Sequence, residues 1–158
     1  MSKVANAPRW LTPDEQLTWR GLVQLIIELQ AEQEEALVTT HGITEGEYGV
    51  LVSLSEAPDH RRRMCDLAAQ LRLSPSGLTR RIDGLAKRGF VTREAAPEDR
   101  RVQLAVLTDD GMAKLEAAAP THVAAVRESL IDHLTADDLH TLGDVLARAR
   151  QSREDRAS

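Results

Sequence analysis

The chain has 158 residues, of which 42% are hydrophobic and 28% are charged, and its net charge is −5. This is the composition of one folded, water-soluble domain. No apolar run approaches the ~20 residues that span a bilayer. The N-terminus lacks the apolar stretch of a secretory signal, and a single cysteine excludes an internal disulfide framework. We therefore expect one domain over residues 1–158, in the cytoplasm, with no cofactor and no metal site.

The charge is distributed unevenly along the chain. Between His60 and Arg101 there are eleven Lys and Arg residues against five Asp and Glu residues. This segment therefore carries +6, and the remainder of the chain carries −11. A basic middle inside an acidic shell directs attraction for a polyanion such as DNA to one surface.

Two capping boxes open the first two predicted helices. Thr12 with Glu15, and Thr44 with Glu47, have the spacing at which each side chain satisfies the other residue's backbone N–H. The first helix carries an apolar stripe from Trp19 to Leu37, about six turns long, which is more than covering a small core requires. We expect Trp19 in the core and part of this stripe against another subunit.

A helix-turn-helix follows. A short helix carries Leu67, Ala68 and Leu71, and the turn after it leads to a second helix over residues 74–88. Ser74 is a good N-cap and Pro75 suits the first helical position. The second helix has one narrow apolar stripe that must face a core, made of Leu78, Ile82 and Leu85.

The opposite face of this second helix is small and cationic. At 3.6 residues per turn it presents Ser76, Arg80, Asp83 and Lys87, with Thr79 beside them. The major groove of DNA accepts a helix of this shape. An ordinary solvated face is the alternative for this helix taken by itself.

The rest of the chain predicts a hairpin and two more helices. Gly89 ends the second helix, residues 90–93 and 102–107 are strand-like, and residues 95–100 form the turn between them. Thr108 caps a long helix that Pro120 should bend or interrupt. A last helix begins after Thr135 and is expected to fray from about Gln151.

Several sequence elements follow one another in a distinctive order and spacing: Leu67-Ala68, Leu71, Ser74, Thr79-Arg80, Leu85, Arg88-Gly89-Phe90-Val91, Asp99-Arg100-Arg101 and Leu107-Thr108-Asp109-Asp110-Gly111. Through these residues the sequence resembles the MarR (multiple antibiotic resistance regulator) family over residues 12 to 150. The resemblance implies a mainly α winged helix-turn-helix over residues 44–107 with a small β-wing, flanked by dimerisation helices over residues 12–40 and 108–152. It also implies a homodimeric transcription regulator, a repressor of a pseudo-palindromic operator.

Several residues of the second helix are candidates for contact with double-stranded DNA. Arg80 points outward and suits guanine N7 and O6. Ser76 and Thr79 can reach bases or phosphates, and Gly77 allows a close backbone approach. Ser74 lies where a helix N-terminus meets a phosphate. The remaining residue, Arg81, is nearer the buried edge and is expected to contact the DNA backbone or to pack.

The hairpin supplies further candidates. The resemblance implies that Arg100 or Arg101 enters the minor groove while Asp99 orients an arginine; a tip that is merely solvated is the alternative. The run from Arg61 to Arg63 either clamps phosphates or flanks a short strand.

The resemblance also suggests a small aromatic or phenolic effector between the dimer helices and the reading module. Trp19, His41 and Tyr48 mark the neighbourhood to search. By a population shift, an effector that favours another spacing of the two reading helices would release the DNA.

Two alternative functions stay open. A winged-helix module that binds only proteins predicts a reading face without exposed cations. A thiol-based redox sensor would use Cys65, at the start of the first helix of the helix-turn-helix, where the helix N-terminus lowers a thiol's pKa; the alternative for Cys65 is a small residue in a partly buried turn. The sequence has no phosphate loop, nucleophile elbow or metalloprotease motif, so we do not expect an enzyme.

Overall fold

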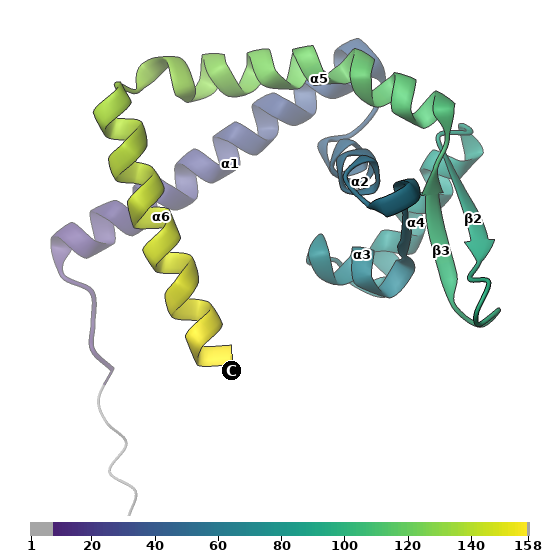
Figure 1. Cartoon of the computed structure of the whole chain (residues 1–158). Coiled ribbons are helices and arrows are strands. Elements are labelled where there is room, and N and C mark those ends of the chain that lie inside the picture. The colour runs from purple at the N-terminus through teal and green to yellow at the C-terminus, as the bar shows by residue number, and fades with distance from the viewer. Residues whose placement is uncertain (1–7, 158) are drawn as a thin grey trace, which may run out of the picture.

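The computed structural model describes residues 8–157, and side chains as far as residue 152 (Figure 1). It is mainly helical with one small sheet. None of the helices in this part of the chain is long and apolar enough to cross a membrane. The elements are α1 (Pro13–His41), α2 (Glu45–Ser55), η1 (Pro58–His60), β1 (Arg61–Arg63), α3 (Met64–Gln70), α4 (Pro75–Lys87), β2 (Val91–Ala95), β3 (Gln103–Leu107), α5 (Asp109–Ser129), η2 (Ile131–His133) and α6 (Ala136–Ala157).

Both predicted capping boxes are confirmed. The Thr12 hydroxyl accepts from the Glu15 N–H while the Glu15 carboxylate accepts from the Thr12 N–H, and Thr44 and Glu47 repeat the arrangement. Gly42 ends α1 in the left-handed conformation, at φ 66°, and donates its N–H to the Val38 carbonyl. Glycine adopts this φ without steric cost, so α1 stops here and the chain turns into α2.

The core lies between the short helices, the sheet and the C-terminal end of α1. Its fully buried side chains include Leu37 from α1, Leu51 and Leu54 from α2, and Leu67 from α3. The apolar stripe of α4 completes it, as the sequence predicts. These elements form the lobe at the right of Figure 1.

The long helices extend away from this lobe. Helix α5 packs along the C-terminal part of α1, and α6 descends from the far end of α5 (Figure 1). Every described side chain of α6 is exposed, and so are most of those in the first half of α1. The expectation that Trp19 lies in the core is therefore wrong: the residue is 56% exposed, because no element among the described residues covers that half of α1.

The sheet has three strands rather than the two of the predicted hairpin. The strand order is β1-β3-β2, and β1 pairs antiparallel with β3 through Arg61 to Val106 and Arg63 to Leu104. Three consecutive arginines lack the apolar alternation that signals a strand, so the pattern alone identified only β2 and β3. The run from Arg61 to Arg63 is a strand of the wing sheet.

The C-terminal helices differ from expectation at two points. Pro120 does not interrupt α5, which is continuous from Asp109 to Ser129. A proline inside a helix removes one of its backbone hydrogen bonds. The packing of α5 along α1 outweighs that loss, so the helix continues through Pro120. The last helix is not frayed from Gln151, because α6 continues to Ala157.

Gly111, in the first turn of α5, is where the wing and the long helices meet most closely. A Cβ built at this position would lie 2.0 Å from the Phe90 carbonyl oxygen and 2.8 Å from Leu107 Cδ1. Thr108 fixes the same joint: its hydroxyl donates to the Gly89 carbonyl at 2.7 Å and accepts from the Gly111 N–H at 3.0 Å. The Leu-Thr-x-x-Gly element therefore encodes a close approach of two backbones.

We predict that Gly111→Ala lowers the free energy of unfolding by about 1–3 kcal/mol or more, because the methyl group overlaps a backbone atom that cannot move aside. Urea unfolding followed by circular dichroism measures this. Gly49→Ala in α2 is the matched control, since nothing lies within 4 Å of its added Cβ. It should stabilise the protein by up to ~1 kcal/mol, and equal stability of the two variants would contradict the role given to Gly111.

Candidate nucleic-acid interface

Helix α4 has one buried side and one exposed side. Leu78, Ile82 and Leu85 are each no more than 1% exposed, which fixes the rotation of the helix about its axis. The side chains of Ser76, Thr79 and Arg80 are exposed on the opposite side. This arrangement presents two hydroxyls and a guanidinium together near the N-terminus of the helix, where the backbone dipole also favours an anion.

The first turn of α4 is built by Ser74. Its hydroxyl accepts from the Gly77 N–H at 3.1 Å and lies 3.2 Å from the Ser76 hydroxyl. Pro75 occupies the first helical position, as predicted. Since a Cβ at Gly77 would lie 3.1 Å from the Ser74 hydroxyl oxygen, glycine keeps this turn tight.

Arg93, on strand β2, joins the wing to α4. Its guanidinium lies 2.7 Å from the Asp83 carboxylate and donates to the Thr79 carbonyl at 3.3 Å. The carboxylate of Asp83, on the outward face of α4, is therefore paired with a cation. Sequence reasoning did not single out Arg93, since the pair depends on the packing of β2 against α4.

Arg81 packs against α2 and lies at the back of the reading face. A Cβ on Gly46 would lie 2.6 Å from the Arg81 Cζ, so the guanidinium covers that glycine closely. The structure thus gives Arg81 the packing position that was one of its two expected roles. Its neighbour Arg80 carries no such contact and is exposed.

The wing tip holds Asp99, Arg100 and Arg101, all exposed. The Asp99 carboxylate accepts from the backbone N–H of Arg101 at 2.9 Å, and its carbonyl accepts from the Val102 N–H at 2.9 Å. Asp99 therefore shapes the turn through the backbone of Arg101. Both arginine side chains extend from a turn that is internally bonded.

The arginines of β1 have three different surroundings. Arg61 lies 3.8 Å from the Glu94 carboxylate of β2. Arg62 has a buried Nε atom with no hydrogen-bond partner among the described residues. Arg63 is exposed and is the N-cap residue of α3.

Cys65 is the second residue of α3 and does not occupy the N-cap position. It is exposed, which corrects the expectation of a partly buried turn. Its thiol donates to the carboxylate of Asp66 at 3.4 Å.

The three residues expected near an effector are not all brought together. Trp19 and His41 lie at opposite ends of α1, about 33 Å apart along the helix axis. His41 is hydrogen-bonded to Thr121 of α5 at 2.8 Å. The Tyr48 ring lies 4.6 Å from the ring of His122, and burial raises the pKa of its phenol.

Comparisons with known proteins agree with this geometry. The MarR family model matches residues 43–102. Sco3205, a MarR family transcriptional regulator from Streptomyces coelicolor solved in complex with DNA, is 37% identical over 93% of this chain and 92% of its own, with a TM-score of 0.87. AbsC from the same organism, also a MarR family regulator, is 36% identical over 94% of this chain and 99% of its own, with a TM-score of 0.85.

A curated relative gives a similar result. The transcriptional repressor YetL of Bacillus subtilis is 36% identical over 110 residues, which are 68% of this chain and 66% of YetL. The chain thus spans about two thirds of the length of this relative.

We predict that Ser74→Ala lowers the free energy of unfolding by about 1 kcal/mol, because the Gly77 N–H loses its cap. Thermal or urea unfolding measures the change. Ser76→Ala, two residues along on the exposed face, should change stability by less than about 0.5 kcal/mol. If both variants lost the same stability, the hydroxyl of Ser74 would have no special role as a cap.

Proposed function

Since the chain belongs to the MarR family of transcription regulators, we propose that it is a homodimeric repressor of a pseudo-palindromic operator, released by a small-molecule effector. Its place of action would be the cytoplasm, where DNA is accessible. The repressor assignment follows the names of YetL and of MdtR, a transcriptional repressor that is 26% identical over 91% of this chain.

The observation that carries the proposal is the two-sided character of α4. Its apolar side is buried, while the exposed side offers hydroxyls and a guanidinium beside a basic wing. A major groove is wide enough for such a helix. The similarity to Sco3205, which was solved with DNA, supports the same use here. Exposed cations on this face also disfavour a module that binds only proteins.

We assign the DNA contacts as follows. Arg80 would read a guanine, with Ser76 and Thr79 reaching bases or phosphates. The first turn, Ser74 to Gly77, would receive a phosphate at the helix N-terminus. The wing would place Arg100 or Arg101 in the minor groove from the turn that Asp99 braces. Arg63 would contact a phosphate, and Arg81 would act by packing or by a backbone contact.

The dimer is supported by apolar surface that no described part of the same chain covers. On α6, Leu139, Leu142 and Leu146 share a face and are 36–46% exposed. On α1, Trp19, Leu22 and Ile26 are 41–56% exposed. Apolar patches of this extent are typical of an interface, and we propose that residues 12–40 and 108–152 form it while residues 44–107 read DNA.

A two-fold axis would then set the operator. Two α4 helices related by that axis enter successive major grooves about one helical turn apart, about 34 Å. An effector would release the DNA to the extent that it binds better to a dimer in which this separation differs.

We propose that the effector binds beside Tyr48 and His41, where α1, α2 and α5 meet. The Nδ1 atom of His122 is buried there and has no hydrogen-bond partner among the described residues. An acidic or phenolic group would satisfy this atom, and the rings of Tyr48 and His122 offer an aromatic surface. Trp19 lies too far along α1 to line the same site in one subunit.

Redox sensing through Cys65 is the less supported alternative. The thiol is exposed, but the side chain that it contacts is the carboxylate of Asp66 and not a cation or a second thiol. The chain has no second cysteine to form a disulfide within one subunit.

For the dimer, we predict that Leu142→Glu shifts the protein towards monomer, because a carboxylate would be buried without a partner. Sedimentation equilibrium over a concentration series measures this. Gln151→Glu is the matched control, since it adds the same charge on the opposite side of α6 and should leave the dimer intact. A dimer that withstands Leu142→Glu would contradict the proposed interface.

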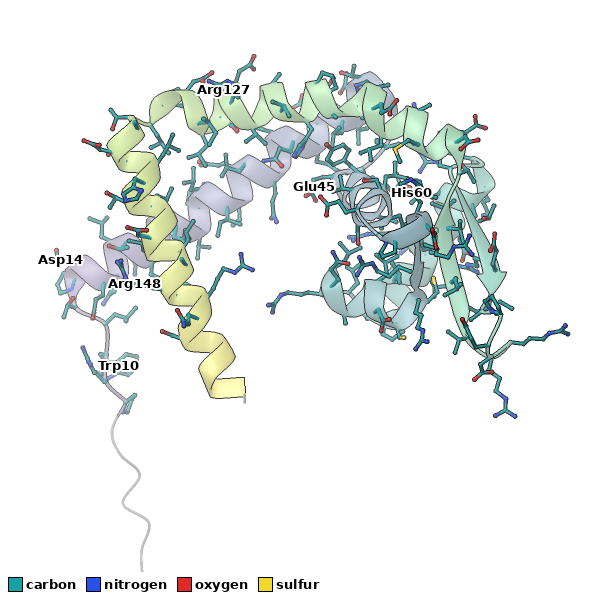
Figure 2. The ribbon with its side chains drawn as sticks, viewed as in Figure 1. Trp10, Asp14, Glu45, His60, Arg127 and Arg148 are labelled. Atoms are coloured by element: carbon teal, nitrogen blue, oxygen red, sulfur yellow. The ribbon has the colours of Figure 1, made fainter. Side chains whose placement is uncertain are left out.

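For DNA binding, we predict that the protein prefers its operator over a scrambled duplex by at least ~1000-fold, as specific sites usually do. Arg80→Ala should lose about 1–3 kcal/mol of that binding. Fluorescence anisotropy with the DNA flanking its own gene, in a salt series, measures both, and selection from random DNA supplies the operator if the flanking DNA lacks it. Arg127→Ala, on α5 away from the reading lobe (Figure 2), is the control for loss of a cation. No binding at low salt would overturn the proposal.

A further inference from the structure

We infer that Arg88 is a positioning residue that fixes the orientation of the reading helix α4 relative to the long helices α1 and α5. It acts through three bonds, one within α4 and two to the corner between α1 and α2, rather than by touching DNA. The inference rests on the proposed function, because it assigns Arg88 to the spacing of the two reading helices in a dimer.

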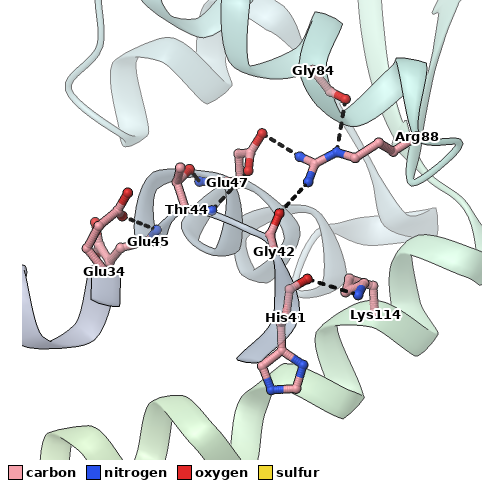
Figure 3. Close-up of polar contacts among 9 residues, drawn as sticks. All are labelled: Glu34, His41, Gly42, Thr44, Glu45, Glu47, Gly84, Arg88 and Lys114. Atoms are coloured by element: carbon pink, nitrogen blue, oxygen red, sulfur yellow. Dashed lines mark hydrogen bonds and ion pairs between the residues drawn. The ribbon is translucent and has the colours of Figure 1, made fainter. Parts of the chain in front are cut away.

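The guanidinium of Arg88 bonds three separate groups (Figure 3). Its Nε donates to the Gly84 carbonyl in its own helix at 3.2 Å. One terminal nitrogen donates to the Gly42 carbonyl, at the end of α1, at 2.9 Å. The other pairs with the carboxylate of Glu47 in the first turn of α2. One planar group therefore joins the end of α4 to the corner between α1 and α2.

Glu47 is itself fixed. The second oxygen of its carboxylate accepts from the Thr44 N–H at 3.0 Å, which is the capping box that starts α2. Its side chain is only 15% exposed, and that of Arg88 is 33% exposed. Partial shielding from water and preformed geometry make this pair stronger than an ordinary surface ion pair.

A second cation reaches the same corner from α5. Lys114 donates to the His41 carbonyl at 3.2 Å, one residue before the carbonyl that Arg88 holds. The ring of Phe90 lies near both cations, 5.4 Å from the Arg88 Cζ and 5.6 Å from the Lys114 Nζ. Two cations, Arg88 at the end of α4 and Lys114 of α5, therefore stabilise the negative end of the α1 helix dipole.

The position of this joint gives it a mechanical role. Arg80 lies two turns earlier in α4 and faces outward, so a change at Arg88 leaves the reading side chains in place. The long helices carry the proposed dimer interface. Loosening the joint therefore alters how the two reading helices lie relative to each other, without altering what each one reads.

Arginine is required because lysine cannot make all three bonds. The guanidinium offers five N–H donors in a fixed plane, whereas the ammonium is a single point of charge on a flexible stem. Arg88→Lys keeps the charge and tests geometry. Arg88→Gln removes both, and Glu47→Gln removes the partner's charge while keeping an acceptor for the Thr44 N–H.

The first arm of the test compares an operator with two half-sites against a duplex with one. We expect all three variants to bind the full operator about tenfold more weakly, a common size for coupling between sites. The half-site, which engages one module, should bind within about twofold of wild type, as for an independent region. Arg9→Gln breaks an exposed ion pair with Glu15 instead, at a residue outside both the proposed interface and the DNA-reading region, and should change neither affinity.

The second arm needs no DNA. Cys65 is the only cysteine and is exposed on α3, so a spin label on it reports the distance between the two reading modules of a dimer. Pulsed dipolar spectroscopy should give a narrow distribution for wild type and for Arg9→Gln. For Arg88→Gln and Arg88→Lys it should give a broader or displaced one. Thermal melting identifies any variant that fails to fold. If Arg88→Gln does not fold, Glu47→Gln and Arg88→Lys are measured in its place.

The outcomes are separable. Unchanged distance distributions in the folded variants overturn the inference, and so does an equal loss of affinity for half-site and full operator. A wild-type protein with no dipolar signal is not a dimer, which overturns the proposed function and this inference with it. If wild type gives a narrow distance distribution but does not prefer the full operator, the proposed DNA-binding function is wrong. The distance distributions of the variants then decide by themselves whether Arg88 fixes the orientation of α4.

Discussion

The burial of three leucine and isoleucine side chains on one side of α4 is the constraint on which the reading surface depends. Leu78, Ile82 and Leu85 contribute to the same core as α2, α3 and the sheet, and a helix with one buried stripe has one allowed rotation. The outward direction of Arg80 follows from that rotation. The proposed recognition of DNA by this lobe is therefore a consequence of hydrophobic packing, because the buried side chains decide which side chains of α4 face solvent.

The distribution of charge along the chain adds to the effect of packing. The acidic remainder of the chain limits non-specific attraction to DNA, while the basic segment concentrates it on one surface. Within that surface the anion Asp83 is already paired with Arg93. This ion pair reduces the repulsion of DNA near the exposed face of α4. Repulsion from the acidic remainder of the chain would orient the approach of the nucleic acid.

Local signals predicted the elements well, and long-range contacts were beyond them. Capping boxes at Thr12 and Thr44, the Ser74 cap and the α4 stripe are encoded within four to eight neighbouring residues, so the sequence is sufficient to place them. The exposure of Trp19 depends on the absence of a covering element, and the strand at Arg61 depends on β3 as a partner. The bonds that tie Arg88 to Gly42 and Glu47, and Arg93 to Asp83 and Thr79, join residues 10 to 46 positions apart, which no periodicity encodes. The DNA contacts of α4 were inferred from its helical faces, and those of the wing tip and the effector neighbourhood from the resemblance.

The arginine run of β1 has a consequence for the behaviour of the protein in concentrated solution. In the order β1-β3-β2, both outer strands have an unpaired edge, and such edges invite pairing with another sheet. One edge is three residues long and consists entirely of arginine; the other carries two charged residues, Arg93 and Glu94, which pair with Asp83 and Arg61. Adding a strand at either side would bring like charges together or bury them. The same residues that make the lobe attractive to a polyanion therefore protect its small sheet against aggregation.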